Sequence, residues 1–319
     1  MSYQGGTLLA EVVRSGFVEG RHHGSVVVLD AEGQVVDSAG DVTSPVFPRS
    51  ANKPMQAVGM LRTGLVLTDP ADLALVCASH WGQDFHINRV QTMLHSVGLA
   101  ETHLRCPPAL PLDPEAVAAV YRAGGGPSRV LMNCSGKHAG MLLTCRAAGL
   151  PVEDYYEPDH PLQERLQQAV TDCTGEPVAA TGVDGCGAPL YAVSLTGLAR
   201  AFLTLVGAVP GSAERMVADA MRAHPELVAG THPEATDTRL MQGLPGLLVK
   251  SGAEGVVAAA LPGGGAVAVK IDDGAGRARV PVLVSGLRRL GATAPVLDEL
   301  ATTPVLGGGR PVGAVRSLW

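Results

Sequence analysis

The chain has 319 residues, of which 46% are hydrophobic and 17% are charged, and its formal net charge is -6. A chain of this length and composition can bury a large core, so we expect a globular protein. The acidic balance provides no positive field to collect phosphates, and aromatic residues for base stacking are only 3% of the chain, which argues against a nucleic-acid partner.

Apolar, β-branched segments near both ends of the chain predict β-strands. Residues 8–20 and 24–40 follow this pattern, and the second segment is a hairpin that turns at residues 31–33. Residues 247–274 show the same pattern, with a turn at residues 262–265 in the sequence PGGG. We therefore expect one antiparallel sheet that is built from the two ends of the chain.

The middle of the chain carries the spacing of apolar residues that is typical of helices. Residues 113–126, 160–175 and 212–230 each combine this spacing with capping residues and glycine stops. A last helix is predicted at residues 280–292 and is expected to pack back on the sheet. The pattern is that of an α+β fold in which strands from both termini enclose a helical insertion.

These elements predict one domain over residues 1–319. The sheet part comprises residues 1–50 and 245–319, and the mainly helical part comprises residues 51–244. We see no sequence repeat and no flexible linker between them. We expect the active site in the crevice between the two parts.

The sequence also predicts a cytoplasmic protein with no membrane partner. No window approaches the ~20 apolar residues of a membrane span. The first residues lack the basic segment and the long apolar run of a signal peptide. The six cysteines are too sparse and irregular for a disulfide scaffold, so we expect reduced thiols.

Ser50 and Lys53 stand three residues apart, immediately before Pro54. Because a proline is comfortable only in the first turn of a helix, a helix should begin near Ser50 and place both side chains on one face. A lysine made partly neutral by burial or by neighbouring positive charge can take the serine proton and leave a nucleophile. Taken alone, the pattern is more often a surface serine beside a solvated lysine.

A second pattern, Lys250-Ser251-Gly252, begins a predicted strand far downstream of Ser50 and Lys53. An S-x-x-K helix followed by K-[ST]-G on a strand is the pairing found in penicillin-recognising serine acyl-transferases. The order and the predicted contexts of the two motifs match. The chain therefore resembles the superfamily of serine β-lactamases and penicillin-binding proteins, and this resemblance implies the same fold.

A closer resemblance rests on five segments taken together and in this order: SANKPMQA, ASHWGQDFH, NCSGKHAGML, GVDGCGAP and KSGAEGV. They resemble the Rhizobium etli type of L-asparaginase, in the asparaginase II family, over about residues 8 to 280. The resemblance implies a β-lactamase-like or glutaminase-like fold and the hydrolysis of L-asparagine to aspartate and ammonia.

The resemblance also implies catalytic roles. Ser50 with Lys53 matches one Ser-Lys pair of the family, and Ser79 with Lys250 resembles a second pair that faces it across the site. Which serine is acylated is left open by the sequence. We expect Ser50, because the same rigid helix turn supplies its base, with Ser79 and Lys250 completing a proton relay.

Two cysteines bracketed by glycines, Cys134 and Cys186, are candidate zinc ligands. On spacing alone they could bind zinc with a nitrogen from Lys137 or His138, but small buried hydrophobic residues beside tight turns are the more common interpretation. The resemblance implies that Cys134, Lys137 and Cys186 hold a zinc near the substrate. Such a metal could orient the substrate or the nucleophilic serine.

The resemblance gives L-asparagine as the partner molecule, and a small amino acid needs a partner of each charge. We expect Arg49 to meet its carboxylate and Asp184 its α-amino group, with His138 as a further substrate-binding residue. Each of the three could also be a loop residue with a local hydrogen bond. The sequence leaves a homodimer open.

Other functions stay open at this point. A glutaminase would share the fold and act on a substrate that is longer by one methylene group. A penicillin-interacting serine peptidase or esterase would share Ser50, Lys53 and Lys250. A non-enzymatic regulator is a third alternative, which the intact set of motif residues disfavours.

Overall fold

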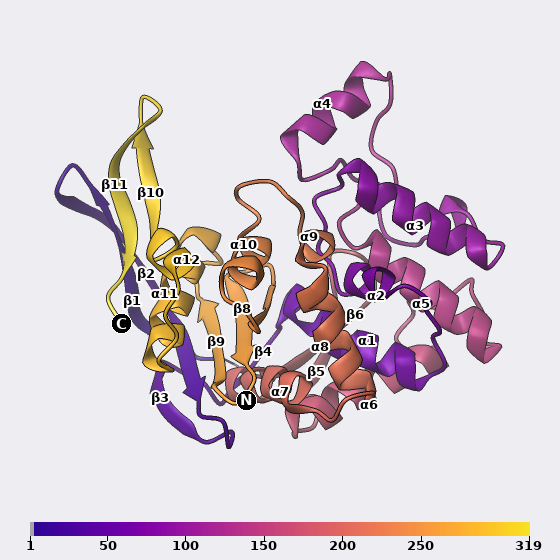
Figure 1. Cartoon of the computed structure of the whole chain (residues 1–319), viewed down its shortest axis with the longest axis horizontal. Helices are drawn as coiled ribbons and strands as arrows, with labels where there is room; N and C mark the ends of the chain where they lie inside the picture. The colour runs from indigo at the N-terminus through magenta and orange to yellow at the C-terminus, as the bar shows by residue number, and fades with distance from the viewer. Residues whose placement is uncertain (1–2) are drawn as a thin grey trace.

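The computed structural model describes residues 3–319, and its architecture is α+β (Figure 1). Within this range, one sheet contains eight strands, every neighbouring pair of which is antiparallel. Its strands are β1 (Thr7–Arg14), β2 (Phe17–Leu29), β3 (Val35–Ala39), β7 (Leu248–Ser251), β8 (Val256–Leu261), β9 (Gly265–Ile271), β10 (Thr302–Gly307) and β11 (Arg310–Ser317). They are ordered β10-β11-β1-β2-β9-β8-β7, and β3 also pairs with β2. The predicted α+β class, with a sheet built from both ends of the chain, is confirmed.

The first predicted strand is in fact a hairpin. β1 and β2 are joined at Ser15 and Gly16, whose φ angles are 48° and 82°. Two residues of positive φ make a tight turn whose twist matches that of the flanking strands. The turns predicted at residues 31–33 and 262–265 are confirmed. The hairpin of β10 and β11 was not predicted. Its strand β11 also pairs with β1, at the other end of the chain, and local sequence patterns do not reveal such a contact.

Helices fill the sequence between the two groups of strands and also follow β9. They are α1 (Lys53–Arg62), α2 (Pro70–Val76), α3 (Asp84–Ser96), α4 (Pro114–Arg122), α5 (Ser135–Ala148), α6 (Pro161–Thr174), α7 (Leu195–Gly207), α8 (Ala213–Ala223), α9 (Pro225–Val228), α10 (Thr236–Gly243), α11 (Gly276–Arg289) and α12 (Pro295–Glu299). The predicted helices correspond to α4, α6, the pair α8 and α9, and α11. No helix in the described part of the chain is long and apolar enough to span a bilayer.

Three short strands and two 3-10 turns complete the structure. The strands β4 (Pro45–Val46), β6 (Pro189–Ser194) and β5 (Ala180–Val183) form a small antiparallel sheet in that order. The 3-10 turns are η1 (Arg49–Asn52), directly before α1, and η2 (Glu101–His103). Figure 1 shows the large sheet on one side of the molecule and helices α1 to α6 on the other.

The centre of the large sheet is covered on both faces. Consecutive residues of β8 and β9 are buried, and because successive side chains of a strand point to opposite faces, both faces must be covered. Helices α7 and α11 both pack against these two strands. At Gly286 in α11, a Cβ atom would lie 2.6 Å from Cγ1 of Val267, so glycine is what allows this helix to lie so close to β9.

Helix α1 forms the buried centre of the helical part. It contacts α2, α5, α6 and α8, and all its residues from Lys53 to Met60 are buried. Pro54 lies in its first turn, and η1 precedes it, so the predicted helix start near Ser50 is confirmed. A Cβ atom at Gly59 would lie 3.0 Å from Cα of Leu166 in α6. This glycine therefore sets how closely α1 and α6 approach.

Replacing Gly59 by alanine should destabilise the protein, because the new methyl group meets the backbone of α6, which cannot rotate away. We expect a loss of about 1–3 kcal/mol in the free energy of unfolding, the usual cost of overpacking. The control is Gly207→Ala at the end of α7, where a Cβ atom meets nothing within 4 Å. Urea denaturation of both variants tests this, and equal stability of the two would contradict it.

Candidate active site

Ser50, Ser79 and Lys250 line one cavity of ≈ 260 Å³. Its walls come from η1, from the segment after α2, from the start of α10 and from the end of β7, so it lies between the sheet and the helices. Pockets for drug-sized ligands measure about 300–1,000 Å³. The cavity is therefore suited to a smaller molecule, of the size of a single amino acid.

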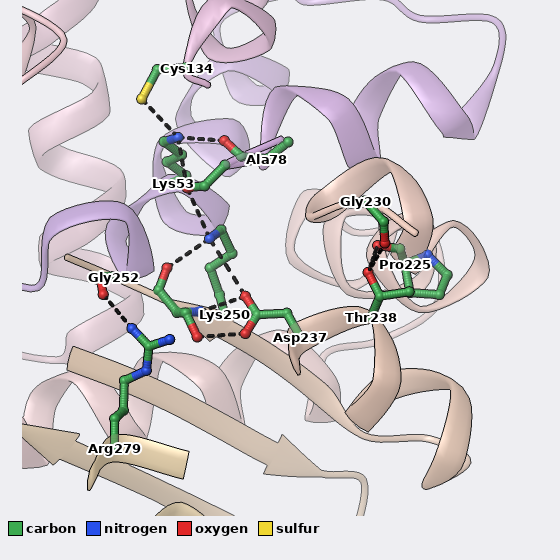
Figure 2. Close-up of polar contacts among 12 residues, drawn as sticks. Lys53, Ala78, Cys134, Pro225, Gly230, Asp237, Thr238, Lys250, Gly252 and Arg279 are labelled. Carbon is green, nitrogen blue, oxygen red and sulfur yellow. Dashed lines mark hydrogen bonds and ion pairs between the residues drawn. The ribbon is translucent and has the colours of Figure 1, made fainter. Parts of the chain in front are cut away.

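The side chain of Lys53 is buried, and its ammonium group makes three hydrogen bonds (Figure 2). The Nζ atom donates to the carbonyl oxygen of Ala78, to Oγ of Ser79 at 3.1 Å and to Sγ of Cys134 at 3.1 Å. An ammonium has three donors, so these contacts use all of them. Lys53 thus holds Ser79 rather than Ser50, although Ser50 is its neighbour on the same turn.

Lys250 reaches the same serine from the sheet. Its Nζ atom donates to Oγ of Ser79 at 3.1 Å and to the carbonyl oxygen of Ser251 at 2.7 Å. The carboxylate of Asp237 lies 3.7 Å away. Burial lowers the pKa of Lys250 to about 8; Asp237 opposes this shift, and the positive charge of Lys53 adds to it. Lys250 can therefore become a neutral amine, and so a base, slightly above neutral pH.

Asp237 is fixed in turn by the residue that follows Lys250. Its two carboxylate oxygens accept hydrogen bonds from the hydroxyl of Ser251 at 2.5 Å and from the backbone N–H of Ser251 at 2.8 Å. These bonds join the start of α10 to the end of β7 (Figure 2). The cation of Lys250 is thereby held beside a carboxylate whose orientation is fixed.

The backbone at Ser79 and Trp81 is anchored to the end of α9 and to Ala229, which follows it. The Ser79 N–H donates to the carbonyl oxygen of Val228 at 2.9 Å. The hydroxyl of Thr238 lies 2.9 Å from the carbonyl oxygen of Pro225 and 2.8 Å from that of Gly230, which ties this segment to α10 (Figure 2). The serine and the loop that borders the cavity are therefore positioned together.

The glycine of the Lys250-Ser251-Gly252 motif has a packing role. A Cβ atom at Gly252 would lie 2.3 Å from the carbonyl oxygen of Pro48, a backbone atom that cannot move freely. Because glycine stands there, the start of η1 packs directly on the end of β7. This contact brings Ser50 and Lys250 to the same cavity.

Cys134, Lys137 and Cys186, the predicted zinc ligands, converge in a buried position next to Lys53. The Nζ atom of Lys137 donates to Sγ of Cys186 at 3.2 Å. A hydrogen bond from the Cys134 thiol lowers the pKa of Cys186, and Lys137 and His138 contribute to this. The same hydrogen bond and burial raise the pKa of Cys134. The pair therefore favours one thiolate, on Cys186, stabilised by positive charge.

The donor atoms of this group suit zinc, which prefers thiolate sulfur and nitrogen in a four-coordinate site. The pKa of Lys137 is raised, since the negative charges of Cys186, Cys134 and Asp184 outweigh the opposing effect of burial. A metal would have to replace the lysine proton. Within residues 3–319, no group of three or more His, Cys, Asp or Glu side chains could hold a metal ion, so a zinc site at the two cysteines would need Lys137 as its third protein donor.

Arg49 and Asp184, the predicted partners of the amino acid, are paired with each other. Nε of Arg49 donates to Oδ1 of Asp184 at 2.7 Å, and Nη1 lies 3.5 Å from Oε1 of Glu254. Arg49 lines a different cavity, of ≈ 330 Å³, which it shares with Tyr3. His138, the third predicted residue, is buried.

The ring of His138 joins α5 to the loop before α6. Its Nδ1 atom lies 2.6 Å from the hydroxyl of Tyr155. Its Nε2 atom is buried and has no hydrogen-bond partner among residues 3–319. Burial lowers the pKa of His138, although Cys186 opposes the shift. His138 therefore lies beside the cysteine pair rather than on the wall of the Ser50 cavity.

Three charged residues on this cavity, Glu234, Asp237 and Arg279, were not predicted from the sequence. Asp237 lies in the first turn of α10, where an acidic residue is ordinary and gives no signal. Arg279 lies in the first turn of α11, where a positive charge opposes the helix dipole. An arginine at the start of a predicted helix is therefore a weak indication, visible in the sequence, of a functional residue.

The fold and the cavity define an α+β protein with a small polar site between a sheet and helices. The family model described as L-asparaginase II matches residues 10–317. The chain therefore belongs to the L-asparaginase II family. No curated protein matches the chain.

Several solved structures are similar to the chain at low sequence identity. Mglu in its tris and glutamate form is 15% identical, with a TM-score of 0.43, and the match covers 84% of this chain and 59% of Mglu. A β-lactamase from Mycobacterium bovis is 16% identical, with coverage of 79% and 88% and a TM-score of 0.45. A putative β-lactamase from Bacteroides dorei is 13% identical, with coverage of 84% and 93% and a TM-score of 0.48. The chain thus spans about three fifths of the length of Mglu.

Proposed function

We propose that the protein hydrolyses L-asparagine to L-aspartate and ammonia through an acyl-enzyme on Ser50, as in L-asparaginases of the Rhizobium etli type. One observation carries the mechanism: Oγ of Ser79 lies 3.1 Å from the amines of both Lys53 and Lys250, on the wall of the cavity that Ser50 also lines. A serine hydroxyl beside a lysine that can become neutral can pass a proton from a neighbouring nucleophile to that lysine. The family supports an amide as the substrate.

In the acylation step, Oγ of Ser50 attacks the side-chain amide carbon of asparagine. The proton of Ser50 passes through the hydroxyl of Ser79 to the neutral amine of Lys250. The C–N bond then breaks, and Lys250 returns this proton to the departing nitrogen, so that ammonia leaves and an ester remains on Ser50. Water then attacks the ester carbon and gives its proton through Ser79 to Lys250. The bond between this carbon and Oγ of Ser50 breaks, the proton returns to Ser50, and aspartate leaves.

The different settings of the two serines support this division of roles. Ser79 is fixed between two amines, which suits a group that transfers protons. Ser50 lies in η1, directly before the first turn of α1, where the positive end of the helix favours negative charge developing near it. None of the three donors of Lys53 restrains the Ser50 hydroxyl.

We also propose that Cys134, Lys137 and Cys186 hold one zinc ion. Zinc bound there would supply a fixed positive charge that polarises or orients polar groups of the substrate. Lys53 donates both to Sγ of Cys134 and to Oγ of Ser79, so the charge on Cys134 influences the lysine that positions this serine. The protein residues transfer the protons.

Replacing Ser50 by alanine should lower ammonia release from L-asparagine by at least about 1,000-fold, since loss of a catalytic serine typically has effects of this order or larger. The fold should persist, because only a hydroxyl is removed. Ser285→Ala, at a serine in α11 that bonds the carbonyl of Pro281, is the control and should keep full activity. Mass spectrometry of enzyme quenched during turnover should find the acyl adduct on the Ser50 peptide; an adduct on Ser79 would reverse the two roles.

The value of kcat/KM should rise with pH through about 8, because Lys250 accepts a proton only when it is neutral. A histidine base would instead give a plateau that begins near ~6.5. Asp237→Asn removes the negative charge that raises the pKa of Lys250, so the rising limb should move to lower pH in this variant. Initial rates between pH 5 and 10 test both statements, and an optimum in the acid range contradicts the lysine mechanism.

The isolated protein should contain close to one zinc per chain, and Cys134→Ala and Cys186→Ala should each lower the metal content. Cys145→Ala is the control, since Cys145 is a buried thiol on α5, the helix that carries Lys137, and is outside the proposed ligand set. Elemental analysis measures the metal directly. A metal-free preparation with full activity would remove zinc from the mechanism and leave both cysteines as packing residues.

A further inference from the structure

We infer that Arg279 binds the α-carboxylate of the substrate and thereby restricts the enzyme to amides of free amino acids. The inference rests on the proposed amide hydrolysis at Ser50. Arg279 is on the first turn of α11 and lines the same cavity as Ser50, Ser79 and Lys250. Its Nη1 atom donates to the carbonyl oxygen of Gly252 at 2.8 Å, which fixes the guanidinium at the end of β7 (Figure 2).

Most hydrogen-bond donors of Arg279 are unused. A guanidinium carries five N–H donors, and the bond to Gly252 accounts for one of them. The Nε atom is buried and finds no hydrogen-bond partner anywhere in residues 3–319. A guanidinium with unused donors costs free energy where protein excludes water, so its place on a cavity wall indicates a ligand that pairs with it. A carboxylate is the ligand that matches the planar fork of an arginine.

The charge of Arg279 is also not neutralised by the protein. No carboxylate in the described part of the chain lies within 4 Å of its guanidinium, whereas Arg49 has two such partners. Asp237 attracts Arg279 electrostatically, but its oxygens are occupied by Ser251 and lie beside Lys250. The cation therefore faces the cavity with its charge available to an anion.

The position of Arg279 is unfavourable for folding alone. The N-terminal end of a helix carries a partial positive charge, so a cation in the first turn is repelled. Burial lowers the pKa of Arg279, which shows that its surroundings disfavour its charge. A residue that is disfavoured by both its helix and its environment is better explained by a ligand than by stability.

Arg49, the arginine predicted for this role, is less suited to it. Its guanidinium is paired with Asp184 at 2.7 Å, and it lines the separate cavity that contains Tyr3. A substrate carboxylate at Arg49 would have to share the guanidinium with Asp184. Arg279 has no carboxylate partner within 4 Å in residues 3–319 and would not have to share its charge.

The charges around the cavity fit a free amino acid in one orientation. Arg279 lies on its wall with an acidic residue, Glu234, which can face the α-ammonium group. A peptide-bound or C-terminally amidated asparagine has no α-carboxylate and would leave Arg279 unpaired. The enzyme should therefore discriminate strongly against such compounds, because a site built to bind a charged group rejects analogues that lack it.

The test compares the binding of L-aspartate, the product, with that of β-alanine, which is the same skeleton without the α-carboxylate. Calorimetry is applied to the wild-type protein, to Arg279→Met, to Arg279→Lys and to the control Arg277→Met, whose arginine lies on the same turn outside this cavity. Arg279→Met should weaken L-aspartate binding by about 10- to 100-fold, the range for charged hydrogen bonds, and leave β-alanine binding unchanged. Arg279→Lys should lose less, and Arg277→Met should lose nothing.

Melting temperatures establish that each variant is folded, and Arg279→Lys, which keeps the charge, tests the inference if Arg279→Met does not fold. Unchanged L-aspartate binding in Arg279→Met, or an equal loss for L-aspartate and β-alanine, overturns the carboxylate assignment while the proposed hydrolysis stands. A wild-type protein that releases no ammonia from L-asparagine overturns the proposed function, and this inference with it.

Discussion

The hydroxyl of Ser79 joins two buried lysines that come from different parts of the molecule. Lys53 lies at the start of α1 in the helical part, and Lys250 lies on β7 in the sheet, yet both amines are 3.1 Å from the same oxygen. Two buried cations are tolerated only where each has hydrogen-bond partners. The close packing of the sheet against the helices, made possible by Gly252 next to Pro48, is therefore a condition for the site.

The electrostatics of the site follow from this arrangement. The charge of Lys53 helps to lower the pKa of Lys250, and Asp237 limits the shift, so that Lys250 can change protonation near pH 8. On the other side, Lys53 contacts Cys134, and Cys134 interacts with the Cys186 thiolate. A continuous series of polar contacts thus runs from the proposed zinc ligands to the carboxylate of Asp237. A negative charge on Cys134 therefore raises the pKa of Lys250.

Many of the strands and helices could be predicted from the sequence, because these elements depend on local patterns of residues. The terminal strands and the helix start fixed by Pro54 follow from periodicity and from proline geometry. The partners of each side chain could not be predicted in this way. Lys53 contacts Ser79 instead of its neighbour Ser50, and Arg49 pairs with Asp184, because these contacts join segments that are far apart in the chain. Arg279 was missed for the same reason: only the packing of α11 places it on the cavity.

Ammonia release by the purified protein from L-asparagine and from L-glutamine tests the central claim most directly. The two substrates differ by one methylene group, which a small pocket discriminates by about 10- to 200-fold. Hydrolysis of L-asparagine with a kcat/KM higher than that of L-glutamine by such a factor is the predicted result. Turnover of neither amide, or a preference for L-glutamine, would contradict the account.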